Sequence, residues 1–149
     1  MIRTQIAAVD RSNEKAQAWL DDLTRELGED SAHAYRVLCA FLHALRDELS
    51  VAEGAQLAAQ LPIFVRGIFY EGWEPARASA RTRDLDTFLL RLAAEAGLAG
   101  KTEASFAALA ASRVLSNHVS DGEARSVEHE LPHQIRALFE LRARDGDVT

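Results

Sequence analysis

Cysteine, proline and glycine are scarce in this chain. Its 149 residues include one cysteine, three prolines and eight glycines. The single cysteine, Cys39, excludes an internal disulfide bond and any metal site made of several thiolates. Its apolar surroundings at residues 37–42 (VLCAFL) favour a small buried side chain over a reactive thiol. The low content of proline and glycine favours helices, because both residues weaken helix interiors.

Long apolar runs are also absent. No uncharged stretch of roughly 18 residues occurs, and residues 1–15 lack the apolar core of a signal peptide. We therefore predict a cytosolic protein with no membrane partner. The net charge of −6 at pH 7 opposes binding to the phosphates of nucleic acids, so we predict no nucleic-acid partner either.

What the chain does contain is typical of a soluble globular domain, with 48% apolar and 27% charged residues. A single domain spanning residues 1–149 is long enough to bury a substantial core. No segment alternates between apolar and polar residues as a strand does, whereas apolar side chains recur at helical spacing. The sequence therefore predicts an all-α protein.

Two segments 70 residues apart carry the same pattern. Residues 45–69 read LRDELSVAEGAQLAAQLPIFVRGIF, and residues 115–139 read LSNHVSDGEARSVEHELPHQIRALF. Seven pairs are identical: Leu45/Leu115, Ser50/Ser120, Glu53/Glu123, Leu61/Leu131, Pro62/Pro132, Arg66/Arg136 and Phe69/Phe139. The repeat predicts a helical bundle of two sequence-related four-helix units, at about residues 12–70 and 84–141, joined by a linker at residues 70–83.

Helix-capping residues predict the boundaries in the first unit. Ser12 is expected to begin the first helix, Gly28 to end it, and Ser31 to cap the second helix. Ser50 and Glu53 are expected to form a capping box, in which the serine side chain accepts from an amide and the glutamate reaches back. A third helix should therefore follow Ser50.

The second unit repeats this order. Asp84 is expected to cap its first helix and Gly97 to end it, while Thr102 caps the second helix. Ser120 and Glu123 form the second predicted capping box. Because the same helix-capping and helix-ending residues occur in both units, they are most simply explained as part of the fold.

One segment matches the sequence pattern of a zinc protease but not the helix geometry that the pattern requires. The sequence from His129 to His133 reads HELPH and matches H-E-x-x-H, whose two histidines must share one face of a continuous helix. Pro132 would interrupt that helix, and it is expected to open the last helix as Pro62 does in the first unit. The same position in the first unit reads AQLPI, without a ligand. We therefore predict that His129 ends one helix and His133 begins the next.

Other signs of catalysis or metal binding are weak. His43 and His118 fall on different helices of different units, and the sequence leaves open whether they meet. Exposed or hydrogen-bonded helix positions are the simpler interpretation of both. No G-x-S-x-G, Walker A or dinucleotide-binding glycine pattern occurs. We predict no catalytic residue, no bound metal and no cofactor.

Arg66 and Arg136 lie in the first turns of otherwise apolar helices, four residues after their prolines. A planar guanidinium suits a partly buried pairing with a carboxylate or with the carbonyl groups at a helix end. The alternative is a joint anion site, in which both arginines converge between the two units.

The linker is the part of the chain that has no counterpart in the other unit. Its aromatic and arginine side chains could attach the connection to the bundle, or they could form an interface for a protein partner. The candidate binding residues are Tyr70, Trp73, Arg77, Arg81 and Arg83.

Residues 42–49 (LHALRDEL) and 58–75 (AAQLPIFVRGIFYEGWEP) closely resemble the bacterial family known as domain of unknown function 2267. The resemblance extends over about residues 12–141 and includes the sequence Leu131–Pro132. It implies a small, all-helical, cytosolic bacterial protein, and it carries over no activity, cofactor or catalytic residue.

Two functions are therefore compatible with the sequence. The favoured one is a non-enzymatic module that binds a protein partner or associates with itself. The alternative is a protein that binds a small molecule or an anion, and could be an enzyme, through a cleft between the two units near Arg66 and Arg136.

Overall fold

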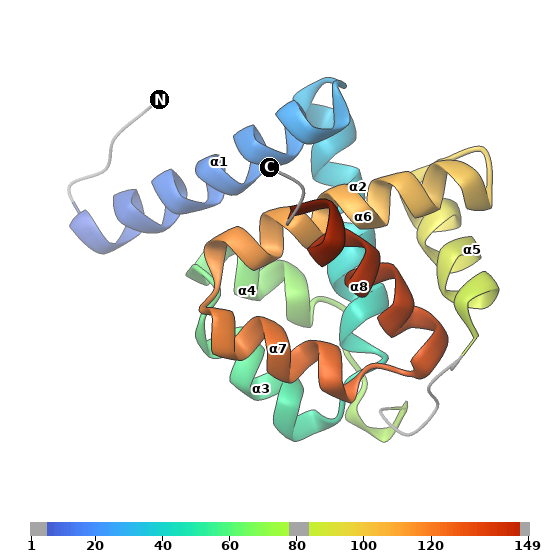
Figure 1. Cartoon of the computed structure of the whole chain (residues 1–149). Coiled ribbons are helices and arrows are strands. Elements are labelled where there is room, and N and C mark those ends of the chain that lie inside the picture. The colour runs from blue at the N-terminus through green and yellow to red at the C-terminus, as the bar shows by residue number, and fades with distance from the viewer. Residues whose placement is uncertain (1–5, 78–83, 147–149) are drawn as a thin grey trace.

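The described part of the chain is helical throughout (Figure 1). The computed structural model describes residues 6–77 and 84–146, with the backbone alone for residue 77 and residues 140–146. No strand occurs within these ranges, which confirms the predicted all-helical class. The elements are α1 (Ala7–Leu27), α2 (Ser31–Arg46), α3 (Val51–Ala59), α4 (Ile63–Tyr70), the 3-10 helix η1 (Pro75–Arg77), α5 (Leu85–Ala96), α6 (Lys101–His118), α7 (Asp121–Glu130) and α8 (His133–Gly146).

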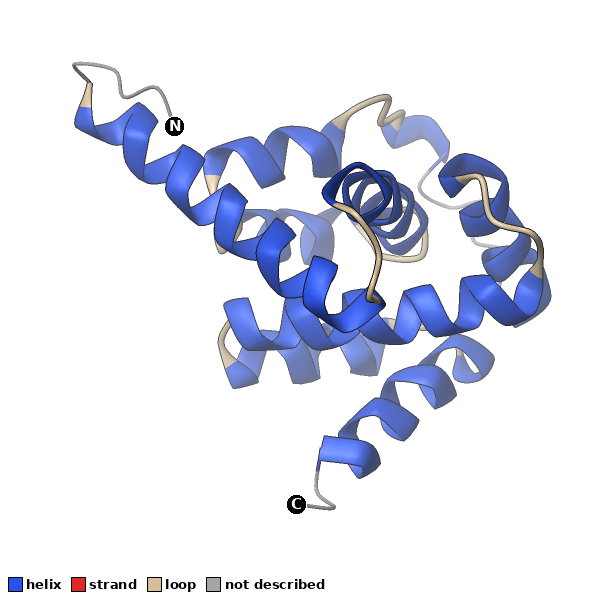
Figure 2. Ribbon diagram, turned by 90° about the horizontal axis from the view of Figure 1, so that it is seen from above, coloured by secondary structure: helices blue, strands red, loops and turns tan. Residues whose placement is uncertain are grey.

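Helix α2 lies at the centre of the molecule. It contacts α1, α4, α5 and α6, and a view along its axis shows it surrounded by other helices (Figure 2). Nine of its 16 residues are buried. Burial of apolar surface is the main favourable contribution to folding, so α2 and the aromatic side chains around it form the core. The largest side chains that are almost completely buried include Trp19, Phe41, Phe69 and Phe88.

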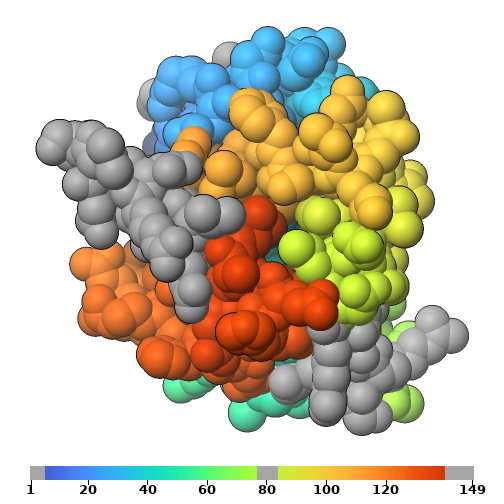
Figure 3. Space-filling view, turned by 45° about the vertical axis from the view of Figure 1, so that its right-hand side comes forward, coloured from blue at the N-terminus to red at the C-terminus, as the bar shows by residue number. Residues whose placement is uncertain are grey.

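Helix α6 packs against α1, α2, α5 and α8. Its buried surface consists mainly of alanine, at positions 104, 107, 108, 110 and 111. The separation of two packed helices depends on the side chains between them, and small side chains allow a close approach. Figure 3 shows the outer face where α5, α6, α7 and α8 lie together.

Two glycines end helices as predicted. Gly28 follows α1 with φ 69° and Gly97 follows α5 with φ 72°. Both are in the left-handed region, where a residue with a Cβ is disfavoured. Asp84 caps α5 as predicted, because its carboxylate accepts from the Thr87 amide at 3.2 Å.

Three predicted helix starts were wrong. Helix α1 begins at Ala7, five residues before Ser12, and the Ser12 hydroxyl instead accepts from the Phe64 amide of α4 at 3.2 Å. The residues before Ser12 are compatible with a helix, so α1 extends towards the N-terminus without a side-chain cap. A capping residue is therefore not always used where it first occurs in the sequence.

The other two wrong starts differ by one or two residues. The cap of α2 is Asp30, whose carboxylate accepts from the His33 amide at 2.8 Å, so Ser31 is the first helical residue. The cap of α6 is Gly100, which has no side chain, and Thr102 lies inside the helix. In both cases the residue nearer the preceding turn has the backbone geometry of the cap.

The predicted capping boxes are half correct. Ser50 accepts from the Glu53 amide and Ser120 from the Glu123 amide, each at 3.1 Å. The glutamates, however, do not reach back. The Ser120 amide donates to the Gln60 side chain at 2.8 Å, at the end of α3. The equivalent Ser50 amide donates to the carboxylate at the end of α7.

This carboxylate belongs to Glu130. Each of the two helices α3 and α7 therefore supplies, from its last turn, a cap for the start of the other. The two helices consequently run antiparallel, side by side (Figure 1). Because the serine amides already have these partners, the side chains of Glu53 and Glu123 do not serve as the caps that the sequence predicted.

Candidate functional site

The structure separates the two halves of the zinc-like motif. Helix α7 ends at Glu130 and α8 begins at His133, so His129 and His133 lie on different helices, as predicted. Among the described residues no group of three or more His, Cys, Asp or Glu side chains is arranged to hold a metal ion.

His43 and Cys39 share one face of α2 but form no reactive pair. His43 has a carboxylate oxygen of Glu95 at 2.7 Å from Nδ1 and the Ile68 carbonyl at 2.7 Å from Nε2. Each ring nitrogen of His43 therefore already faces an oxygen atom of another residue. Burial raises the pKa of the Cys39 thiol, with further contributions from Glu71 and Glu95. A raised pKa suppresses the thiolate, which is the reactive form of cysteine.

Arg66 and Arg136 hold the ends of two helices. The Nε of Arg66 donates to the Ala58 carbonyl at 2.8 Å, and its Nη2 donates to the Leu61 carbonyl at 3.0 Å. Arg136 makes the equivalent bonds to the carbonyls of Glu128, at 2.9 Å, and Leu131, at 3.2 Å. The carbonyls at the end of a helix have no partner within it, and these guanidinium groups supply one.

The two arginines do not converge. Arg66 lies at the end of α3 and Arg136 at the end of α7. Because α3 and α7 are antiparallel, these ends lie at opposite extremes of the pair. A helix of the length of α3 spans about 13 Å. A single anion therefore does not reach both guanidinium groups.

The linker residues fall partly outside the described residues. Tyr70 and Trp73 pack together with a ring-centroid distance of 5.1 Å, and Tyr70 also packs edge-on against Phe69 at 5.2 Å. Both side chains are half-buried. The backbone of Arg77 belongs to η1, whereas Arg81 and Arg83 lie outside the described residues.

A hollow of about 490 Å³ opens beside Arg66, between α1, the turn from α3 to α4, and the end of α6. Three further basic side chains line it: Arg11 and Lys15 of α1, and His118 of α6. None of the described residues that line the hollow is acidic. We call these four residues and the space between them the basic hollow.

The four basic side chains differ in how they are held. Arg66 is fixed by backbone carbonyls. The ring of His118 stacks on Trp19 with a centroid distance of 4.9 Å and donates from Nε2 to Asp22 at 2.6 Å. Arg11 and Lys15 are exposed, and neither makes an ion pair with any residue that the structure describes. The hollow thus combines two fixed basic groups with two that are available to a ligand.

Sequence reasoning selected Arg66 and missed the other three residues of the basic hollow. Arg11 and Lys15 are spaced i, i+4, which places them on one face of a helix. At the offset that aligns Gly28 with Gly97, the second half has Ala80 and Asp84 in their place.

His118 likewise has no basic counterpart, because the residue 70 positions earlier is Glu48. These three differences between the halves were a signal for a site in one half only. The convergence of α1 on the end of α6, however, is a feature of the tertiary structure.

No helix within the described ranges has the length and apolar character needed to cross a membrane. No curated protein matches the chain. The model of one protein family matches residues 16–138, most of the chain. The chain therefore belongs to the family described as "Uncharacterized conserved protein (DUF2267)".

Proposed function

We propose that the protein binds a small anion in the basic hollow. The observation that carries the proposal is the gathering of Arg11, Lys15, Arg66 and His118 around one space with no acidic lining residue among those described. The whole chain has a net charge of −6, so a local concentration of basic groups is not a consequence of composition. Basic side chains without a protein partner are favourable sites for carboxylate or phosphate groups.

The lining also favours an apolar portion in the ligand. Ile63 borders the hollow and is 66% exposed, beside Leu61 and Pro62. An anion that carries an apolar group would neutralise the basic side chains and cover this edge. The proposal requires binding but no reaction, since no nucleophile paired with a base lines the hollow among the described residues.

The test is a titration with three probes: inorganic phosphate, pyrophosphate and octanoate. We expect at least one of them to raise the melting temperature, because a ligand that binds the folded state stabilises it. The double substitution Arg11→Ala/Lys15→Ala should weaken that binding by roughly tenfold or more, which corresponds to about 1.4 kcal/mol. Its fold should persist, since both side chains are exposed and make no ion pair within the described structure.

The matched control is Arg36→Ala/Arg125→Ala, which removes two exposed arginines away from the hollow. It should retain the affinity of the wild type. If both double variants lost affinity to the same extent, net charge and not the hollow would be what attracts the anion. A melting temperature that none of the three probes changes would contradict the proposal.

A second candidate is self-association through α4. Ile63 and Phe64 are consecutive apolar residues and are 66% and 47% exposed. Large exposed apolar side chains that adjoin each other are typical of interaction surfaces. This observation supports the interaction module that the sequence analysis preferred, with α4 in place of the linker as the proposed contact surface.

We also propose that the chain is an internal duplication of a four-helix unit. The paired roles of Gly28 and Gly97 as helix ends support it. The paired caps and the paired arginine contacts at the ends of α3 and α7 support it as well. The sequence analysis also expected a cytosolic location and a bacterial origin, and we keep both as proposals.

A further inference from the structure

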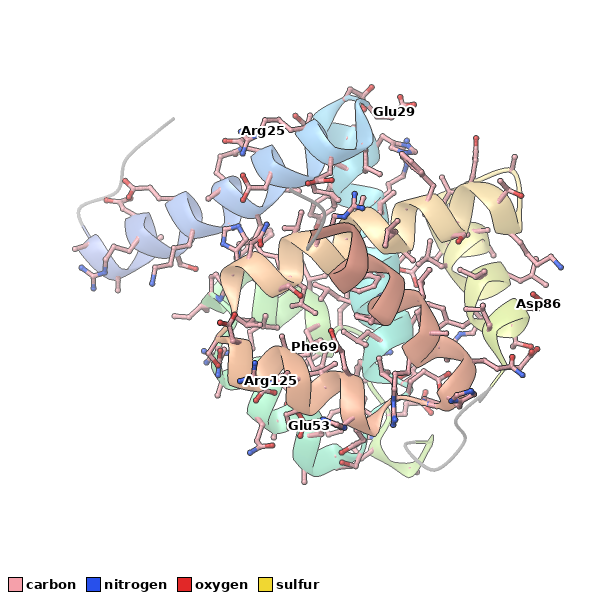
Figure 4. The ribbon with its side chains drawn as sticks, in the orientation of Figure 1. Arg25, Glu29, Glu53, Phe69, Asp86 and Arg125 are labelled. Carbon is pink, nitrogen blue, oxygen red and sulfur yellow. The ribbon has the colours of Figure 1, made fainter. Side chains whose placement is uncertain are left out.

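Two buried carboxyl groups occupy the contact between α3 and α7. Glu53 of α3 is 6% exposed and Glu123 of α7 is 8% exposed. Figure 4 labels Glu53 on α3, below α7. In each residue the Oε1 atom is buried, and no donor in the described structure forms a hydrogen bond with it. Buried acceptors without a donor are unfavourable, so this pair requires an explanation.

The electrostatics of the pair point to a bound proton. Burial is the largest cause that raises the pKa of Glu123, to about 7, followed by a side-chain hydrogen bond with Glu53 and the charge of Glu53. The second oxygen of Glu53, Oε2, accepts from the Ser126 hydroxyl at 3.0 Å. Glu53 thus already accepts one hydrogen bond, and the carboxyl whose pKa is raised is that of Glu123. The proton is therefore better placed on Glu123.

We propose that Glu53 and Glu123 together form a binding site for a single proton, with Glu123 as the acid that donates to the Glu53 carboxylate. One shared proton gives both Oε1 atoms a partner, because one becomes a donor and the other accepts from it. It also leaves one buried charge where full ionisation would leave two. Loss of the proton places two negative charges in the α3–α7 contact and weakens it.

Charged and titratable groups on the helices that pack against α3 and α7 have their own partners. Arg66 of α4 and Arg136 of α8 donate to helix-end carbonyls, and His118 of α6 donates to Asp22. Glu130 of α7 accepts from the Ser50 amide. None of these groups neutralises Glu53 or Glu123.

The remaining charged residues near the pair do not change this conclusion. Asp121, Arg125 and His129 of α7 are exposed. Glu48 is a further buried carboxyl, in the turn before α3, but the raised pKa of Glu123 has burial and Glu53 as its causes. The pair is therefore expected to titrate as a unit of its own.

The first test is a carbon-13 NMR titration of the glutamate side-chain carboxyl groups in the wild-type protein. We expect one carboxyl resonance to titrate with a midpoint near 7, and Glu123→Gln to remove that transition. Glutamates in ordinary surroundings titrate at about 4.3. If every glutamate resonance has completed its titration below about pH 5.5, the proton site does not exist.

The second test measures stability against pH. A carboxyl with a raised pKa in the folded state holds its proton more tightly than in the unfolded state. Its stabilising effect is therefore complete below about pH 4.5 and is lost as the pH rises through about 7. Glu123→Gln keeps a donor at this position at every pH.

Between pH 5 and pH 8 the folding equilibrium constant of the wild type should fall relative to that of Glu123→Gln by a factor on the order of 50. The matched control is Asp121→Asn, which removes an exposed carboxylate from the same helix. Its ratio to the wild type should not change over this range. A ratio for Glu123→Gln that is equally constant would overturn the proposal, and the NMR titration decides the question if the variant does not fold.

Discussion

Arg66 and Arg136 each connect the end of one helix to the helix that follows. Their positions after Pro62 and Pro132 made a structural role predictable, because a residue kept in both halves of the chain is explained by the fold. The structure places each guanidinium on the carbonyls that the preceding helix leaves without partners.

Arg136 provides a test of that role away from the basic hollow. Arg136→Ala should lower the free energy of unfolding by about 2 kcal/mol, since hydrogen bonds that involve a charged group contribute roughly 1.5–3 kcal/mol. For a domain of this size that loss corresponds to a decrease of about 4–8 °C in melting temperature.

Thermal unfolding followed by circular dichroism measures the difference. The control is Arg25→Ala, because Arg25 is 73% exposed and, among the residues that the structure describes, forms an ion pair with Asp22, three residues away. Exposed ion pairs of this kind contribute little. Similar melting temperatures for the two variants would refute the helix-end role of Arg136.

Single residues also mark the limit of what the sequence could show. Ser50 and Ser120 were predicted correctly as caps, because the bond to an amide three residues on is local. The destination of the glutamate side chains depends on what another helix brings to the serine amide. Gln60 reaches the Ser120 amide only because α3 and α7 pack antiparallel, and no local pattern contains that information.

At the scale of helices, the all-α class and the order of the elements were predictable from apolar spacing and capping residues. Errors occurred at the starts of α1, α2 and α6, where several residues could serve as a cap. Helix ends at glycine were predicted correctly, since a positive φ leaves few alternatives. The predicted boundaries were therefore most accurate where backbone geometry restricts the residue type.

Two glycine substitutions should have opposite effects for this reason. Gly97→Ala should lower the free energy of unfolding by about 1 kcal/mol, because alanine is strained at φ 72°. Gly67→Ala should raise it by up to about 1 kcal/mol, since Gly67 lies within α4 and alanine is the better helix former.

Neither substitution creates a steric clash, because a Cβ at Gly67 or Gly97 would meet nothing within 4 Å. Backbone conformation alone therefore separates the two variants. Urea denaturation gives both free energies, and effects of the same sign would contradict this explanation.

At the scale of the whole molecule, the basic hollow depends on packing between helices that are far apart in the sequence. Arg11 and Lys15 are about 100 residues from His118, and they meet because α1 packs against α6. The sequence predicted a cleft near Arg66 but expected Arg136 in it. That expectation assumed that equivalent residues of the two halves would line one site. The residues that correspond to Arg11, Lys15 and His118 in the other half are not basic.

The exposed apolar side chains of α4 allow a test of self-association. Phe64 is 47% exposed, and its burial between two molecules would favour a dimer. We expect wild-type protein to show a mass that increases with concentration in sedimentation velocity experiments, and Phe64→Ser to remain a monomer.

Phe106→Ser is the matched control, since Phe106 is 60% exposed on α6, a different helix. This variant should associate as the wild type does. Monomeric wild-type protein across the concentration range would rule out association through α4 and leave anion binding as the remaining candidate.

The reciprocal caps between α3 and α7 also constrain how the chain can change. Gln60 and Glu130 each sit in or just after the last turn of one helix and bind the first cap of the other. Lengthening either helix by one residue would rotate its terminal side chain by about 100° and move it about 1.5 Å along the axis. Both bonds depend on the same antiparallel alignment, so insertions and deletions in these two helices are tolerated only as matched pairs. In engineered versions of this protein, α3 and α7 must therefore be redesigned together as a single unit of fixed length.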